Sequence, residues 1–281
     1  MVIRPLTSDD VEAAAAVMLA ALPIPAEYDD GHRRGWLQRR TLHLLRTDPG
    51  GCWAAEDGGE LVGVALALVR DGIWGLSMLA VHPDRHARGA GGQLLAAAMA
   101  YEGDGVRGGI VAASEDPRAT RLYARAGFDL RPCVSTAGVV DRSGLPAGLR
   151  SAASEDVEHA VAFSRPVRGG AYDPADLALL ADRPGHGLLL LEGGGFAIHA
   201  PDGSPLVLCA TDDDAAADLL LSCFASGPRG ASAHVDFITA GQDWAVRASL
   251  DCRLALSADG PVFTRGELGP LRPWLPSGAF L

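Results

Sequence analysis

The stretch LAVHPDRHARGAGGQLL, residues 79–95, decides the fold of the first half of the chain. An apolar run ends at Val81, three glycines follow between residues 89 and 92, and an Ala/Leu-rich segment begins at Gln93. This order predicts a strand, a glycine-rich loop and a helix that starts near Gly91. The N–H groups at a helix start carry partial positive charge, and glycines let a ligand approach them closely. The loop therefore indicates a binding site for a pyrophosphate.

The loop alone leaves a second interpretation open, because a glycine-rich connection that binds no ligand has the same local pattern. A dinucleotide-binding G-x-G-x-x-G is excluded as the sequence stands. Leu94 occupies the position of its third glycine.

The same stretch resembles the acetyl-CoA-binding motif of the GNAT acetyltransferase superfamily. The core of that motif, Q/R-x-x-G-x-G/A, reads H-A-R-G-A-G at residues 86–91. Downstream, DPRATRLYARAGF at residues 116–128 is similar to the family's second motif, N-x-x-A-x-x-L-Y-x-x-x-G-F. His86 replaces the usual glutamine or arginine and Asp116 the usual asparagine, but neither change touches the glycines. The resemblance covers about residues 1–141.

The resemblance implies a sheet that splits beside residues 79–81, with the pantetheine arm in the split and the pyrophosphate on the loop amides. The residues that it implies for coenzyme binding are Leu79, Ala80, Val81, His86, Ala87, Arg88, Gly89, Ala90, Gly91, Gly92 and Asp116. Tyr123 matches a tyrosine that faces the departing sulfur in many family members. A phenol with a pKa near 10 can act there as a general acid. The alternative for Tyr123 is a half-buried core position at helical spacing.

Turn dipeptides organise the remaining part of the first half. Gly58-Gly59 and Asp71-Gly72 separate apolar runs, which predicts antiparallel strands at 52–57, 61–69 and 73–81. Helices are predicted at 11–22, 32–46, 93–102 and 118–126. The segment 143–156 is typical of a linker, and the predicted elements after it repeat this order in outline.

We therefore expect an α/β (α+β) fold of two tandem GNAT-like domains, residues 1–143 and 144–281. Each would be a mostly antiparallel mixed sheet flanked by helices. In the second domain the helix near residue 214 begins with Asp212-Asp213-Asp214 and no glycine. These carboxylates would repel a pyrophosphate, so this copy is expected to be degenerate and to complete or support the acceptor site. In its apolar tail, Trp274, Phe280 and Leu281 are expected to be buried.

Charge and composition exclude several classes of function. The net charge is −11, and residues 144–281 contribute most of it, with 17 acidic against 9 arginine side chains. An acidic surface argues against nucleic-acid binding and suits a cationic amine. The five cysteines form no C-x-x-C pair and the histidines have no metal-ligand spacing, so no metal is predicted. We find no secretory or membrane-spanning pattern, which predicts a cytoplasmic protein that does not bind membranes.

These features predict an N-acetyltransferase in which a primary amine of a small molecule attacks acetyl-CoA directly, with Tyr123 as general acid. The acidic run Tyr28-Asp29-Asp30 and Ser77 are candidates for acceptor binding; a solvated loop and a structural serine are the alternatives. Ser77, Ser114 and Glu56 are candidate bases, each more typical of a structural role. A protein N-acetyltransferase and a non-catalytic acetyl-CoA sensor or interaction protein stay open as functions. The oligomeric state also stays open, with a homodimer as one option.

Overall fold

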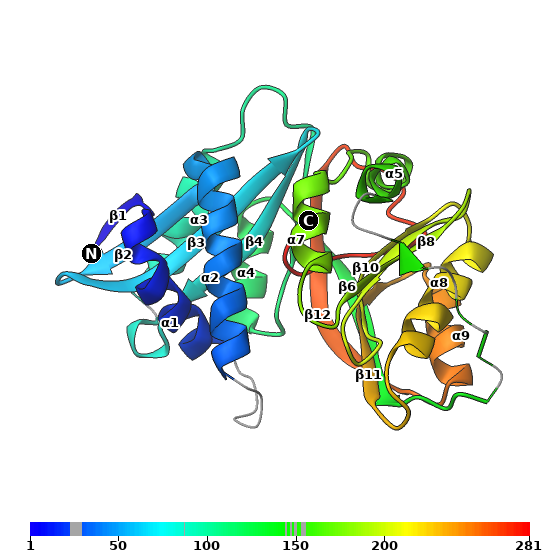
Figure 1. Cartoon of the computed structure of the whole chain (residues 1–281). Coiled ribbons are helices and arrows are strands. Elements are labelled where there is room, and N and C mark those ends of the chain that lie inside the picture. The colour runs from blue at the N-terminus through cyan, green and yellow to red at the C-terminus, as the bar shows by residue number, and fades with distance from the viewer. Residues whose placement is uncertain (23–29, 87, 144, 147, 149–150, 153–155) are drawn as a thin grey trace. The chain divides into compact units, whose positions relative to one another are not determined.

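The computed structural model (Figure 1) describes residues 1–22, 30–86, 88–143, 145, 146, 148, 151, 152 and 156–281. The chain forms two compact units. The first contains Met1–Val69, Trp74–Val106 and Leu281, and the second contains Arg70–Ile73 and Arg107–Phe280.

A sheet forms the framework of the first unit. Four strands are neighbours in chain order: β1 (Val2–Pro5), β2 (Cys52–Asp57), β3 (Glu60–Arg70) and β4 (Ile73–Val81). β1 is antiparallel to β2, and β2 to β3. Gly58 and Gly59 have φ values of 66° and 85°, as a tight hairpin turn requires. The three strands predicted from the turn dipeptides are confirmed.

Helices cover both faces of this sheet. α1 (Val11–Ala21) and α2 (Asp30–Thr47) lie on one face and α3 (Ala90–Met99) on the other (Figure 1). The short 3₁₀ turns are η1 (Ser8–Asp10), η2 (Pro49–Gly51) and η3 (Pro83–Arg85).

Close packing fixes α3 against the sheet. A Cβ atom at Gly63 of β3 would lie 2.9 Å from Leu94 Cδ1, so any larger residue there would force the Leu94 side chain to shift. The buried Trp74 indole on β4 donates a hydrogen bond to the Ala98 carbonyl at 3.2 Å. The start of α3 is therefore held at the end of β4.

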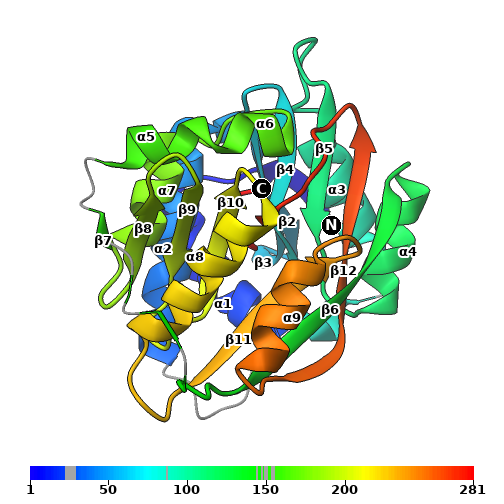
Figure 2. The ribbon, with the colours of Figure 1, turned by 90° about the vertical axis from the view of Figure 1, so that its right-hand side faces the viewer.

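The second unit contains a sheet of interleaved strands. Its members are β5 (Gly108–Ala112), β6 (Asp129–Val139), β11 (Ser232–Thr239) and β12 (Ala255–Gly266). Their order is β5-β12-β6-β11, and every neighbouring pair is antiparallel (Figure 2). β12, which comes late in the chain, thus separates β5 from β6, and β6 separates β12 from β11.

The helices that precede β6 and β12 end in the same way. After α4 (Pro117–Arg125), Gly127 has a φ of 86° and the Phe128 N–H donates to the Tyr123 carbonyl at 3.2 Å. After α9 (Asp243–Asp251), residue 253 has a φ of 63° and the N–H of residue 254 donates to the Ser249 carbonyl at 3.0 Å. Both are left-handed C-terminal caps with one hydrogen-bond pattern, which aligns Tyr123 with Ser249.

A second sheet completes this unit. Its order is β13 (Trp274–Leu275), β10 (Pro205–Ala210), β9 (Gly195–His199), β8 (Gly187–Leu191) and β7 (Ser151–Ala152). α8 (Asp213–Ser226) covers one face (Figure 2), where Leu189, Ala197 and Leu208 join its apolar core. On the other face Tyr172 packs edge-on against Phe196. The adjoining helices are α5 (Val157–Ala162), α6 (Ser164–Arg168) and α7 (Pro174–Ala181).

The predicted α/β fold class is confirmed, while particular elements differ from expectation. β12 is a long strand that runs to Gly266, because β5 offers it a second hydrogen-bonding edge. The short helix α6 was not predicted. The domain boundary at residues 143/144 stays a prediction, since strands from both sides of it share one sheet. Trp274, Phe280 and Leu281 are fully buried, as expected.

A buried ion pair holds α7 within the second unit. Arg70 Nε and Nη2 donate to Asp176 Oδ2 and Oδ1 at 2.7 and 3.1 Å. The arginine is 7% exposed and the aspartate fully buried. Removing one partner from such a pair leaves the other as an uncompensated charge, and desolvation then dominates.

We predict that Asp176→Ala lowers the free energy of unfolding by about 3–5 kcal/mol. Asp173→Ala is the matched control, because Asp173 caps the same helix through the Ala175 N–H at 2.8 Å. Loss of a helix cap removes only about 1 kcal/mol. Denaturant unfolding of both variants provides the measurement. Equal losses would show that the buried pair adds no more than an ordinary cap.

Candidate active site

The loop between β4 and α3 is held by short-range contacts within the first unit. The His82 N–H donates to the Val62 carbonyl at 2.8 Å, which ends β4 against β3. The His86 ring Nε2 lies 2.9 Å from the Val81 carbonyl oxygen. The unusual histidine of the motif therefore ties the loop back to its strand.

The start of α3 presents backbone donors without a side-chain cap. Its N-cap residue is Gly89, in the left-handed region at a φ of 82°, and among the described residues no side-chain cap of the first turn is recorded. The Gln93 N–H returns to the Gly89 carbonyl at 3.2 Å, so the regular helix begins there. The glycines at 91 and 92 add no side chain to this turn. Free N–H groups at a helix start are suited to a phosphate anion.

Arginines border this loop and are paired with carboxylates. Arg85 Nη2 lies 3.3 Å from Glu60 Oε2, and Arg88 Nη1 lies 3.5 Å from Asp57 Oδ2. All four side chains are at least partly exposed, so each contact contributes little to stability. The arginines add positive charge beside the helix start.

β4 brings the other residues predicted for the first unit to the same place. Leu79, Ala80 and Val81 are the last three residues of β4, directly before the loop. Ser77 lies two residues earlier, is only 4% exposed, and has a hydroxyl without a hydrogen-bond partner within the described residues. Glu56 is engaged by Arg4, whose Nε donates to Glu56 Oε2 at 2.8 Å.

Tyr123 and Asp116 belong to the second unit. The Asp116 carboxylate accepts from the Arg118 N–H at 2.8 Å and caps α4, as expected from the sequence. Tyr123 is 5% exposed and packs edge-on against Phe263, with ring centroids 5.4 Å apart. Burial, and secondarily the charge of Asp116, raises the pKa of the Tyr123 phenol well above its ordinary value of about 10. The phenol therefore stays protonated and can donate.

Three of the predicted site residues, Tyr28, Asp29 and Ala87, lie outside the described residues. Asp30 is the first residue of α2. The helix starts were predictable from sequence because capping is local. The tie between His86 and Val81 was missed, since it needs the folded loop.

Comparison with known proteins identifies the first half. Residues 18–128 match the family model described as the acetyltransferase (GNAT) family. Residues 18–128 thus resemble a GNAT acetyltransferase domain. The match includes the loop before α3 and Tyr123, and it confirms the acyltransferase class that was expected. A search of curated protein sequences found no match.

Two solved structures share the fold of this chain over nearly its whole length. A putative acetyltransferase from Pyrococcus horikoshii is 18% identical with a TM-score of 0.79, covering 100% of this chain and 95% of that one. A GCN5-related N-acetyltransferase from Kribbella flavida is 16% identical with a TM-score of 0.61, covering 94% and 70%. At these identities the likeness establishes the fold alone.

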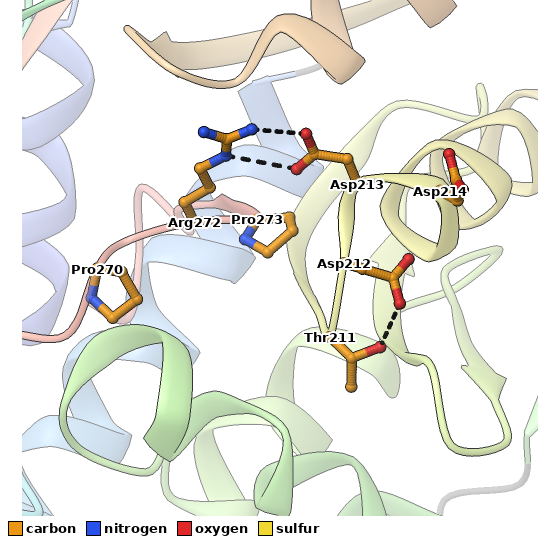
Figure 3. Close-up of a pocket in the computed structure, with 7 residues that line it drawn as sticks. All are labelled: Thr211, Asp212, Asp213, Asp214, Pro270, Arg272 and Pro273. Atoms are coloured by element: carbon orange, nitrogen blue, oxygen red, sulfur yellow. Dashed lines mark hydrogen bonds and ion pairs between the residues drawn. The ribbon is translucent and has the colours of Figure 1, made fainter.

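The start of α8, in the second unit, differs from the start of α3, in the first unit, because a side chain caps it. Asp212 Oδ1 accepts from the Ala215 N–H at 2.9 Å, and this bond lowers the pKa of the Asp212 carboxyl. Arg272 Nη2 lies 2.6 Å from Asp213 Oδ2 (Figure 3). These side chains line an open hollow of about 520 Å³ with Thr211, Asp214, Pro270 and Pro273. At the start of α8, a carboxylate caps the helix and an arginine pairs with the next carboxylate. At the start of α3, the first N–H groups have no side-chain cap.

No helix in the described part of the chain is long and apolar enough to cross a membrane. Across the same ranges, no three His, Cys, Asp or Glu side chains are grouped so that they could hold a metal ion.

We predict that Gly92→Asp weakens the binding of coenzyme A at least about tenfold, because a carboxylate in the first turn repels an anion at a helix start. Gly92→Ala is the matched control: it adds a side chain without charge and favours the helix by roughly 1 kcal/mol. Titration calorimetry of both variants provides the measurement. If the two variants bound coenzyme A equally well, the amides of α3 would not be the anion site.

Proposed function

We propose that this protein is an N-acetyltransferase that moves the acetyl group of acetyl-CoA to a primary amine of a small molecule. The observation that carries the proposal is the uncapped start of α3 behind the GNAT loop. The glycines at 89, 91 and 92 add no side chain where a pyrophosphate would lie, and within the described residues no side-chain cap competes for the amides that would hold it. The coenzyme therefore fits the residues present.

The residues have separate tasks in this proposal. The amides at the start of α3 bind the pyrophosphate, and the backbone of Leu79–Val81 aligns the pantetheine arm. Ser77 and the acidic run at Tyr28-Asp29-Asp30 contact the acceptor. The acceptor nitrogen forms a bond to the acetyl carbon while the carbon–sulfur bond breaks. Tyr123 gives its phenolic proton to the sulfur, the nitrogen loses a proton to solvent, and the phenolate of Tyr123 takes a proton back from solvent.

We further propose that residues 144–281 are a diverged copy that has lost coenzyme binding. The matching ends of α4 and α9 support a common origin. Ser249 stands where Tyr123 stands in the first copy, so the second lacks the proton donor. Its helix α8 begins with a carboxylate cap, which disfavours a pyrophosphate.

We predict that Tyr123→Phe lowers turnover by about 10²-fold, because the departing thiolate loses its proton donor. The change keeps the ring against Phe263, so coenzyme affinity and thermal stability should stay the same. Tyr101→Phe is the control; it removes a phenol that contacts Asp48 Oδ1 at 3.2 Å. Turnover is measured by thiol release with a panel of amines. Undiminished turnover in Tyr123→Phe would remove the general acid from the mechanism.

The pH dependence of the rate follows from the raised pKa of Tyr123. A donor is active below its pKa, so any loss of rate from its ionisation begins above the ordinary tyrosine value of about 10. Below that pH, kcat/KM should rise with the unprotonated fraction of the acceptor amine. A pH–rate profile between about pH 6 and 10 tests this. A falling limb in that range that disappears in Tyr123→Phe would contradict the raised pKa.

A further inference from the structure

The C-terminal segment, defined here as Leu271–Leu275, contacts the ends of three elements in the second unit: the end of β10 and the starts of α8 and α9. Each of these ends has a counterpart in the first half of the chain. The counterparts are the end of β4, the start of α3 and the residue before α4. The GNAT resemblance implies all three for coenzyme binding in the first copy.

The end of β10 corresponds to the end of β4, because each strand leads directly into the next helix start. Leu208–Ala210 are thereby aligned with Leu79–Val81. β13 (Trp274–Leu275) lies antiparallel along this end of β10, and the Ala210 N–H donates to the Pro273 carbonyl at 3.3 Å. Backbone pairing of this kind is how an extended ligand adds to a sheet edge. The edge implied for the pantetheine arm in the first copy is thus occupied by the chain itself in the second.

The start of α8 receives a side chain of the same segment. Arg272 Nη2 donates to Asp213 Oδ2 at 2.6 Å (Figure 3). Pro270 and Pro273 line the same hollow. The charges are reversed relative to α3, where uncapped amides suit an anion. Here carboxylates at the helix start meet a cation of the C-terminal segment.

The start of α9 holds the segment through a buried glutamine. Gln242 precedes α9 as Asp116 precedes α4; both helices have nine residues, and their matching C-terminal caps align them. Gln242 is 1% exposed, its Nε2 donates to the Leu271 carbonyl at 2.7 Å, and its Oε1 accepts from the Trp274 N–H at 3.2 Å. The position that is implied for the coenzyme in the first copy therefore binds the C-terminal segment in the second.

The end of α6 fixes the chain where it enters this place. The Gly269 N–H donates to the carbonyl of the fully buried Arg168 at 2.8 Å, and the Leu271 N–H donates to the Val167 carbonyl at 2.9 Å. Leu271 has a φ of 53°, in the left-handed region that a leucine adopts only at a cost. Such a conformation persists where the surrounding contacts impose it. The contacts of the segment therefore outweigh this local strain.

We propose that the C-terminal segment is a built-in ligand of the second unit, which occupies the coenzyme place of that copy and keeps it closed. An ordinary edge strand needs only the pairing with β10, whereas this segment is also held at both helix starts. The inference rests on the proposed function, because the coenzyme positions of the first copy come from it. Once opened, the place would take the uncharged pantetheine arm, since the carboxylates of α8 repel a pyrophosphate.

Gln242→Asp is designed to open this place in the full chain. Aspartate can still cap α9, but it is shorter than glutamine and has no donor for the Leu271 carbonyl. Loss of this buried hydrogen bond should speed hydrogen exchange of the Ala210 amide by at least about tenfold. The Ala216 amide, which is bonded within α8, should exchange as in wild type. NMR spectroscopy measures both amides.

Arg272→Glu opens the same place from the surface, because it sets a like charge beside Asp213. Arg253→Glu is the matched control; it reverses an arginine that pairs with Asp141 outside the segment and should leave both amides unchanged. Equal acceleration of the two amides in both opening variants would make release of the segment the same event as unfolding, and would overturn the proposal. Unchanged exchange in both would also overturn it.

The ligand test adds acetyl-pantetheine, the acetylated arm of the coenzyme without its phosphates. In Gln242→Asp it should slow exchange of the Ala210 amide back toward the wild-type rate, because its own amide groups replace the Pro273 carbonyl. N-methylacetamide, a single amide group, is the control and should not slow it. In wild type neither compound should change the rate. If acetyl-pantetheine leaves the released amide unprotected, this is no coenzyme place and the proposal is overturned.

Calorimetric titration of wild type with acetyl-CoA keeps the two proposals apart. One coenzyme per chain supports both, since the first copy is then open and the second closed. Two per chain would overturn the built-in ligand and leave the acetyltransferase intact. No binding would remove the proposed function, while the exchange of the Ala210 amide with acetyl-pantetheine would still decide the fate of the segment.

Discussion

The chemistry assigned to this protein depends on the backbone N–H groups at the start of α3. A helix cannot satisfy these groups internally, so each helix start needs a partner from outside the helix. α4, α7 and α8 obtain one from the aspartate side chains Asp116, Asp173 and Asp212. α3 has glycine at the same position and no side-chain cap. The chain thus meets this requirement with an aspartate side chain at three helices. The start of α3, like those of α1, α5, α6 and α9, has no side-chain cap, and at α3 we propose that a ligand takes this place.

The support for this helix start is dense packing rather than polar contacts. Gly63 lets Leu94 approach β3, and Trp74 reaches the Ala98 carbonyl from β4. In the described part of the loop, the His82 N–H bond to the Val62 carbonyl, the contact of the His86 ring with the Val81 carbonyl and partly exposed ion pairs hold the chain in place. A rigid helix behind a short glycine-rich loop keeps the donors in one direction, so a bound anion would require little reorganisation.

Sequence reasoning succeeded where the determinants are local. The turns at Gly58-Gly59 and Asp71-Gly72 and the capping aspartates depend on a few neighbouring residues, and the structure has them where expected. It failed where the partner is distant. The full length of β12 depends on β5, more than a hundred residues earlier in the chain, and Glu56 is engaged by Arg4.

Arg168 shows a different limit of sequence reasoning. Nothing in SRPVRGG distinguishes it from Arg165, whose side chain is largely exposed and paired with Asp71 at 2.8 Å. Only the burial and the hydrogen-bond inventory separate the two arginines. Tyr123 was selected by its motif, and the structure adds its burial and the edge-on contact with Phe263.

The interleaving of β5, β12, β6 and β11 has a consequence for biosynthesis. β5 and β6 do not pair with each other directly, because the strand between them, β12, consists of residues 255–266. A nascent chain leaving the ribosome must therefore wait until residues 255–266 have been made before this sheet can close, with the α4 segment already outside the tunnel. Such long-range pairing slows folding and leaves open strand edges in the interval. If either half of the chain were made alone, this sheet would lack the strands that the other half supplies.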